Sequence, residues 1–218
     1  MDLSWTSRQL SIRAEFASLG SRTDRDELRL GRRAFDQQTW DQLGGAGLWQ
    51  MMVPTDFGGT GVDWWDVTAA LEGLASTIRT PGLLLSVIAQ AGMAYALDLF
   101  GTTAQKSDYF RRILRGELSA TAIADPDTGT DVRASSTFLS PRANETFVLN
   151  GRKYNIAHAP VASFTLVVCK LEGHARDGIS LVLVDQNSKG VTIGPQDRKL
   201  GNLDLPTGQL TFEDVPLH

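Results

Sequence analysis

The spacing of apolar residues changes near residue 118, and this change limits the possible folds more than any other feature of the chain. Before that point apolar side chains recur every three or four residues, as Val67, Leu71 and Leu74 do, which is typical of helices that bury one face. After it, short alternating runs are separated by turn residues, which is typical of strands. We therefore predict two units or an α+β arrangement, with helices over residues 1–117 and a β-barrel or β-sandwich over residues 118–218.

Capping and turn residues divide each half into elements. The candidate helix caps, each before an apolar run, are Thr6 or Ser7, Asp36, Asp63, and Thr102 or Thr103, and Gly20 is expected to end the first helix. The expected helices lie at residues 7–19, 24–35 and 37–43, from 63 to about 74, after Pro81, and from 103 to about 115. The expected strands lie at residues 121–124, 134–139, 146–150, 153–157, 164–170, 179–184, 191–193 and 209–212. Asn150 and Gly151 form a dipeptide that predicts a tight turn between two of these strands.

Charge and cysteine content exclude several classes of function. The 218 residues include 21 Lys and Arg against 25 Asp and Glu, a net charge of −4, which argues against an electrostatic grip on nucleic acid or on an anionic membrane. The single cysteine, Cys169, excludes an intrachain disulfide framework, and the three scattered histidines do not have the spacing of a metal site. The uncharged stretch after Arg79 contains proline and glycines, so we expect a buried helix there and no membrane span. No signal peptide fits the charged first residues, and we expect a cytoplasmic protein.

Two glycine-rich loops are the candidate ligand sites. Residues 56–61, with the sequence DFGGTG, precede a predicted helix, and residues 125–131, with the sequence DPDTGTD, follow the first predicted strand. Glycine lets a backbone approach a ligand closely, and backbone N–H groups with hydroxyls can bind a phosphate or a ring carbonyl. Each loop is also compatible with an ordinary turn, so both interpretations stay open at this point.

Taken together and in order, the segments resemble the acyl-CoA dehydrogenase family over nearly the whole chain. The resemblance rests on segments with the sequences WDQLGGAGL at 40–48, FGGTG at 57–61, LRGE at 114–117, DPDTGTD at 125–131, LNGRK at 149–153 and LTFEDVP at 210–216. It implies an α+β fold, with an all-α domain over residues 1–117 followed by an antiparallel β-barrel domain over residues 118–218, and FAD bound between the β domain and a C-terminal helical domain. It also implies that a glutamate removes the α-proton of an acyl thioester while the β-hydrogen leaves as a hydride to the flavin, with the thioester carried by coenzyme A or a carrier protein.

Several residues depart from the family pattern where flavin contacts are implied. The family usually has Trp, Thr and Thr where this chain has Asn155, Ala157 and Ala124, and Glu where it has Asp125. Thr130 keeps the hydroxyl of the usual Ser. The residues that the resemblance assigns to cofactor binding are Ile123, Ala124, Asp125, Gly129, Thr130, Asn155, Ile156 and Ala157. Losing two hydrogen bonds and one aromatic contact, at about 0.5–1.5 kcal/mol each, predicts weakened FAD binding or its loss, unless Tyr154 or His158 substitutes through a shift in register.

The resemblance also implies that part of the enzyme is missing from this chain. In the family, the point reached at Pro216 leads into the C-terminal helical domain, which carries the catalytic glutamate, and no residue here matches that base. We therefore expect a separate helical C-terminal-domain subunit as partner, in a hetero-oligomer that acts on an acyl thioester. Two alternatives stay open: a non-redox, flavin-poor scaffold subunit of a heteromeric complex, and a non-redox dehydratase or cyclase on the same fold.

Overall fold

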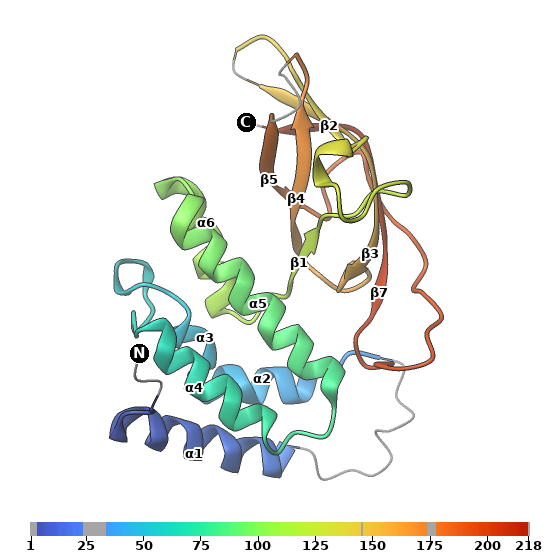
Figure 1. Ribbon diagram of the computed structural model, residues 1–218. Helices are drawn as coiled ribbons and strands as arrows, with labels where there is room; N and C mark the ends of the chain where they lie inside the picture. The colour runs from blue at the N-terminus through green and yellow to red at the C-terminus, as the bar shows by residue number, and fades with distance from the viewer. Residues whose placement is uncertain (1–3, 24–33, 145, 174–177, 218) are drawn as a thin grey trace. The chain divides into compact units, whose positions relative to one another are not determined.

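The computed structural model describes residues 4–23, 34–144, 146–173 and 178–217, which form two compact units. The helical unit holds the described residues up to Glu117 together with Leu200–Leu205, and the β unit holds the remainder. The expected helical region followed by a β region is confirmed (Figure 1). The short segment Leu200–Leu205 is a difference, because it lies between two strands in the sequence but belongs to the helical unit.

The helical unit contains six α-helices among its described residues. They are α1 (Ser7–Thr23), α2 (Gln37–Gly45), α3 (Leu48–Met51), α4 (Trp64–Ala75), α5 (Pro81–Phe100) and α6 (Thr103–Leu114), with a short 3₁₀ helix, η2, at Thr55–Phe57. Asp36 and Asp63 accept hydrogen bonds from backbone N–H groups at the starts of α2 and α4, and Thr102 forms a capping box with Gln105. These three predicted caps are confirmed. The helix predicted over residues 24–35 falls mostly outside the described residues.

Helix α1 continues past Gly20, so the predicted helix end there is wrong. Gly20 is buried, and a Cβ at this position would lie 2.4 Å from the hydroxyl oxygen of Thr77 and 3.2 Å from the carbonyl oxygen of Leu74. The glycine therefore allows α1 to pack closely on the end of α4, and it does not terminate the helix. Its role is set by a tertiary contact that the local sequence does not reveal.

Helix α5 begins at a carboxylate supplied from far along the sequence. The Asp204 Oδ2 atom accepts a hydrogen bond of 2.9 Å from the backbone N–H of Leu83, in the first turn of the helix. A Cβ on Gly82 would lie 2.3 Å from the same carboxylate, so a larger residue at this position would require the Asp204 side chain to shift. The carboxylate satisfies a free N–H group and interacts favourably with the positive end of the helix dipole. This contact explains why Leu200–Leu205 belongs to the helical unit.

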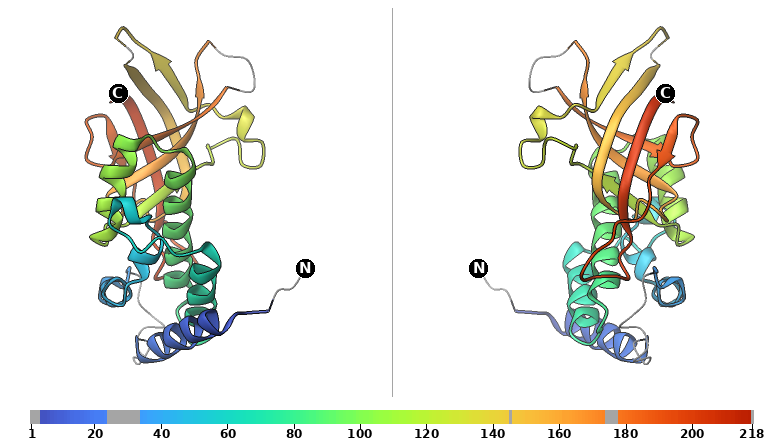
Figure 2. Two further views of the ribbon diagram at one scale, coloured as in Figure 1. Left: turned by 90° about the vertical axis from the view of Figure 1, so that its left-hand side faces the viewer. Right: turned by 90° about the vertical axis from the view of Figure 1, so that its right-hand side faces the viewer.

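The β unit is a seven-stranded sheet. Its strands are β1 (Ser119–Ala122), β2 (Phe138–Pro141), β3 (Phe147–Ala157), β4 (Phe164–Leu171), β5 (Ile179–Asp185), β6 (Val191–Ile193) and β7 (Thr207–Leu217), in the order β1-β4-β2-β3-β7-β6, with β5 paired to β4. The long strands β3 and β7 lie side by side as an antiparallel pair (Figure 2). Strand β4 runs parallel to both β1 and β2, so the sheet is mixed where we expected purely antiparallel pairing.

Two predicted β segments differ from the structure. Asn150 and Gly151 do not form a turn but lie inside β3, at a register shift against β7. The Asn150 amide exchanges two hydrogen bonds with Asp214, and Gly151 has φ of +142° and faces Thr137 so closely that a Cβ would clash. The segment predicted as a strand over 134–139 instead begins in a 3₁₀ helix, η3 (Val132–Ala134), which the side chain of Asp131 caps.

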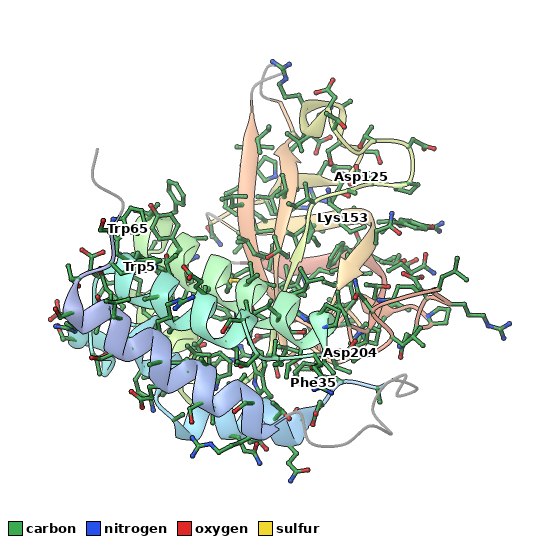
Figure 3. The ribbon with its side chains drawn as sticks, turned by 60° about the horizontal axis from the view of Figure 1, so that its bottom comes forward. Trp5, Phe35, Trp65, Asp125, Lys153 and Asp204 are labelled. Atoms are coloured by element: carbon green, nitrogen blue, oxygen red, sulfur yellow. The ribbon has the colours of Figure 1, made fainter. Side chains whose placement is uncertain are left out.

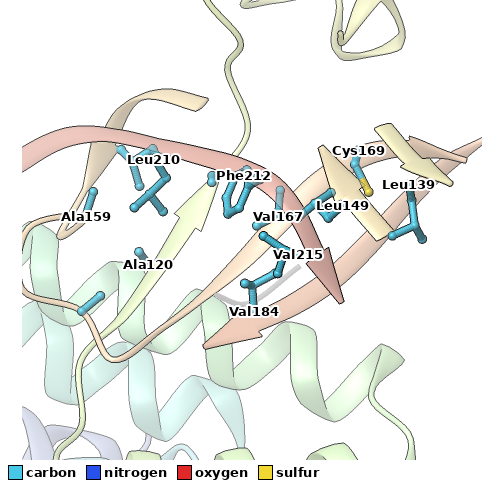
Figure 4. Packing of buried hydrophobic residues seen from close by; sticks show 13 residues of the cluster. Ala120, Leu139, Leu149, Ala159, Val167, Cys169, Val184, Leu210, Phe212 and Val215 are labelled. Atoms are coloured by element: carbon cyan, nitrogen blue, oxygen red, sulfur yellow. The ribbon is translucent and has the colours of Figure 1, made fainter. Parts of the chain in front are cut away.

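Each unit has its own core. In the helical unit Trp40 and Trp49 are buried with ring centroids 4.2 Å apart, and the Trp40 indole N–H donates to the Gly116 carbonyl. In the β unit alternate residues of the strands, including Leu149, Val167, Leu210 and Phe212, pack into a buried apolar cluster (Figure 4). The cluster places the inward side chains of β1, β3 and β4, and it leaves their alternate residues on the opposite face.

Candidate functional site

Backbone pairing brings two of the predicted cofactor segments together. Strand β1 ends at Ala122, and the Ala124 carbonyl oxygen just beyond it accepts a hydrogen bond of 2.9 Å from the backbone N–H of Tyr154 in β3. The Ile123 side chain is 45% exposed, Ala124 is half-buried, and Asn155 is exposed. The structure therefore places Ile123 and Ala124 beside the residues that flank Asn155.

The loop that follows this strand end is closed by a turn. The backbone of Asp125 forms two hydrogen bonds with Thr128, of 3.0 and 3.4 Å. Gly129 and Thr130 then lie exposed, and the space around the Gly129 Cα is open, with no atom within 4 Å of where a Cβ would be. These two predicted residues therefore present backbone and a hydroxyl to an incoming group.

Asp125 is the predicted site residue whose surroundings differ most from expectation. It is buried, and its carboxylate pairs with Lys153, which is also fully buried (Figure 3). It accepts hydrogen bonds from the hydroxyls of Ser135 (2.7 Å) and Thr137 (3.1 Å), from the backbone N–H of Thr137 (3.0 Å) and from the backbone N–H of Ser136. Burial raises the pKa of the Asp125 carboxyl, but the hydrogen bonds from Lys153, Ser135 and Thr137 outweigh it and lower the pKa to about 2. The side chain therefore stays ionised inside the protein, with its carboxylate turned toward Lys153, Ser135 and Thr137.

Sequence reasoning did not identify Lys153, Ser135 and Thr137 as parts of this site. Lys153 does carry a signal, because it occupies an inward position of β3 between the buried residues Leu149 and Ile156. A lysine at such a position is rare unless an acidic partner faces it. Ser135 and Thr137 carry no comparable signal, since short polar residues after a glycine loop are ordinary turn residues.

Strand β3 departs from regular geometry at Asn155. Its φ of +52° is left-handed, a conformation that asparagine tolerates better than most residues, and the pairing with β7 shifts register between Lys153 and Ile156. Ile156 is 1% exposed and belongs to the apolar cluster, so its side chain is turned into the core. Ala157 is half-buried and pairs with Thr207.

His158 does not replace the missing donors at this surface. It is fully buried with φ of +70°, and its Nδ1 atom lies 3.0 Å from the Ser119 carbonyl oxygen. Burial lowers its pKa to about 4, with a further lowering from the charge of Lys199, although the hydrogen bond to Ser119 acts in the opposite direction. The ring is therefore neutral near pH 7.

Metal and nucleophile chemistry find no support in the part of the chain that the structure describes. No three His, Cys, Asp or Glu side chains gather there in a way that could hold a metal ion. Cys169 is buried, and burial raises the pKa of its thiol to about 11, which leaves it protonated and unreactive. Glu72 and Glu117 form ion pairs with Arg13 (2.6 Å) and Arg112 (2.8 Å), so neither is a free general base.

The other glycine-rich loop lies beside a cavity within the helical unit. The cavity has a volume of about 340 Å³, and its lining includes Met51, Pro54, Gly61, Trp64 and Asp98. Gly59 in this loop faces the Val53 carbonyl so closely that a Cβ would clash with it. The glycine therefore allows a tight backbone contact, which is the turn interpretation of this loop.

Comparisons with known proteins agree with a helical region that is followed along the chain by a β region. The sequence model described as "Acyl-CoA dehydrogenase, N-terminal domain" matches residues 9–117, and the one described as "Acyl-CoA dehydrogenase, middle domain" matches residues 120–215. The human protein described as "Short-chain specific acyl-CoA dehydrogenase, mitochondrial" is 31% identical over 79% of this chain and 42% of its own length. The chain spans about half the length of the curated relatives it matches.

Solved structures show the same fold. Butyryl-CoA dehydrogenase from Megasphaera elsdenii superposes with a TM-score of 0.85 at 25% identity, over 100% of this chain and 58% of that chain. A prolyl acyl carrier protein oxidase superposes with a TM-score of 0.89 at 20% identity, over 98% of this chain and 58% of that chain. The second likeness is one of fold alone.

Proposed function

The chain belongs to the acyl-CoA dehydrogenase family, and from this premise we propose that it is a subunit of an enzyme that desaturates an acyl thioester with FAD. The relatives named above act on acyl groups carried by coenzyme A or by a carrier protein, and we propose a thioester of this class as substrate. The observation that carries the proposal is the hydrogen bond between Ala124 and Tyr154. It gathers Ile123, Ala124 and Asn155 at one surface, next to the exposed loop with Gly129 and Thr130.

The residues at this surface fit a flat ring with a phosphate-bearing tail. The exposed side chain of Ile123 is an apolar support for a ring, and the open space at Gly129 lets a ligand reach the backbone N–H groups of the loop. The Thr130 hydroxyl and the Asn155 amide add hydrogen-bond donors. Ala124 and Ala157 add none, so we expect weaker binding than a surface with two hydroxyls would support.

FAD, when bound, supplies the acceptor for the hydride that leaves the β-carbon. This chain's contribution is to hold and orient that group, through Ile123 on the ring side and through Gly129 and Thr130 on the phosphate side. Removal of the α-proton needs a carboxylate base, and Glu72 and Glu117 are both paired with arginines. We propose that the base lies on a helical C-terminal domain.

An exposed apolar stripe on α5 supports the proposal of a partner. Leu85, Ile88, Tyr95 and Leu99 recur at helical spacing and are each 42–53% exposed. By length and composition α5 could cross a membrane, but 44% of its apolar window is buried in the protein, and the buried Gln90 side chain donates to the Glu117 carbonyl. We propose that helices of a separate C-terminal-domain subunit cover this stripe in a cytoplasmic hetero-oligomer.

Flavin binding is tested by incubating the purified chain with FAD, alone and with an acyl-CoA dehydrogenase C-terminal domain expressed separately. After gel filtration we expect a yellow complex that absorbs near 450 nm, roughly where any oxidised flavin absorbs, and that bleaches when acyl thioester is added. A colourless complex with the partner would reject the flavin-dependent activity. Binding of the partner is tested with Ile88→Glu, which should abolish co-elution, and Gln38→Glu on an exposed position of α2 is the matched control.

The second candidate function is the flavin-poor scaffold subunit. One observation favours it: the three positions where donors or an aromatic ring were expected carry Ala124, Asn155 and Ala157, and the His158 ring is buried against the Ser119 carbonyl oxygen. This candidate predicts a stable but colourless heteromer in the same gel-filtration experiment.

A further inference from the structure

We infer that Asp125 and Lys153 are positioning residues, which hold the loop over residues 126–134 in the place where it meets the cofactor and do not bind the cofactor themselves. The inference rests on the FAD binding proposed above. It changes the role of Asp125, because the position of this residue in the loop motif predicts a direct contact.

One carboxylate, that of Asp125, joins the two ends of the loop. Asp125 precedes the loop, and its side chain accepts hydrogen bonds from Ser135, Ser136 and Thr137, which follow it. Between these anchors the loop contains its own turn at Thr128 and the short helix η3. The exposed residues of the loop are therefore held at both ends by a group that solvent does not reach.

Lys153 connects the two ends of the loop to strand β3 of the sheet. Its Nζ atom donates to the Ile123 carbonyl oxygen (2.7 Å) and to the Ser135 hydroxyl (3.2 Å), besides pairing with Asp125. The Thr137 hydroxyl lies 3.3 Å from the carbonyl oxygen of Arg152, which precedes Lys153 in strand β3. The end of β1, the far end of the loop and β3 thus meet at one buried pair of charges.

The effect of the Asp125–Lys153 pair on the position of the loop can be distinguished from its effect on the stability of the fold. A buried ion pair is weak evidence for stability, because apolar side chains of similar volume often stabilise a core equally well. Apolar side chains could not accept the N–H groups of Ser136 and Thr137, nor donate to the Ile123 carbonyl. What the pair adds is the position of the backbone on both sides of the exposed loop.

The test uses the double variant Asp125→Asn with Lys153→Met, which removes both charges together and leaves neither one buried alone. Hydrogen exchange of the whole chain without cofactor is followed over residues 126–137 and over β4 and β5, with urea unfolding and titration of FAD by flavin fluorescence in parallel. We expect residues 126–137 to exchange at least about tenfold faster while β4 and β5 change less. We expect the Kd for FAD to rise by about tenfold.

A smaller change covers the case in which the double variant does not fold. Ser135→Ala removes the hydroxyl that bonds to both charges and should speed exchange in the same segment by a smaller factor. Asp127→Asn makes the same carboxylate-to-amide change at an exposed position two residues away and should leave exchange unaltered. Thr130→Ala should weaken FAD binding without altering exchange, because Thr130 occupies an exposed position of the loop.

The inference is overturned if residues 126–137 exchange at the wild-type rate in both the double variant and Ser135→Ala. It is also overturned if exchange rises equally in β4 and β5, which would mean that the pair only adds global stability. If the wild-type chain binds no FAD even with the C-terminal domain added, the proposed function fails, but the exchange data still decide whether the pair holds the loop.

Discussion

The inner and outer sides of the β1 and β3 strand ends differ in how well their polar groups are satisfied. On the inner side, Asp125 and Lys153 form a dense network with hydroxyls and backbone groups. On the outer side, Ala124 and Ala157 bring no donor, and Asn155 lies exposed on a bulge. The contrast teaches that the residues that hold a ligand loop can change separately from the residues that contact the ligand, because the two sets lie on opposite sides of the same backbone.

The largest effect is expected from a substitution that disrupts the buried network on the inner side. Lys153→Met alone leaves the Asp125 carboxylate buried without its counter-charge, and such losses typically cost about 3–5 kcal/mol. We expect a loss of this size in the free energy of urea unfolding, and a much smaller one for the double variant with Asp125→Asn. A loss below about 1 kcal/mol for the single variant would show that the pair is not essential to the inner side.

As the pH falls, His158 should bind a proton before Asp125 on the inner side does. The folded pKa of His158 is about 4, below its ordinary 6.5, so the unfolded chain binds the proton first as the pH falls. We expect the contribution of His158 to the free energy of unfolding to be fully present above pH 6.5. Between pH 6.5 and 4, the free energy of unfolding should drop by as much as about 3 kcal/mol. The contribution of Asp125, with its pKa lowered to about 2, should be lost only below its ordinary value of 3.8.

The control for this pH dependence is His158→Asn, since asparagine also tolerates the positive φ at that position. Urea unfolding at a series of pH values should give a flatter profile between pH 6.5 and 4 for the variant. An unchanged slope would mean that another group titrates in this range.

Restoring hydroxyls sharpens the comparison from the outer side. The double variant Ala124→Thr with Ala157→Thr adds two donors, and at about 0.5–1.5 kcal/mol each they should tighten FAD binding by roughly fivefold to a hundredfold. Fluorescence titration of FAD measures the change, while hydrogen exchange over residues 126–137 should stay at the wild-type rate. Equal FAD affinity in the variant would argue that these positions do not meet the ring.

The smallest expected effect concerns a carboxylate in the helical unit. Asp204 accepts one backbone N–H at the start of α5, in contrast to the several donors that surround Asp125. Asp204→Ala should therefore cost only about 1 kcal/mol in the unfolding free energy. Chemical denaturation of the chain measures it, and a loss as large as that of Lys153→Met would remove the distinction between a single cap and a network.

Local signals in the sequence predicted those features that neighbours along the chain determine. Asp36, Asp63 and Thr102 start helices because their side chains bond to N–H groups two or three residues ahead. The Asn150–Gly151 dipeptide failed as a turn signal, because it lies inside a strand and bonds to Asp214 across the sheet. At the candidate site the sequence predicted the segments, but not which of their side chains turn inward.

By itself, the sequence determined the division into a helical and a β region and the segments that carry the candidate site, because periodicity and short motifs are local properties. Only the tertiary structure decided that Asp125 and Ile156 turn into the interior, that Gly20 lies within a helix and that Asp204 caps α5. Each of these depends on a partner many residues away. Burial and pairing of polar groups are settled only when the strands and helices meet.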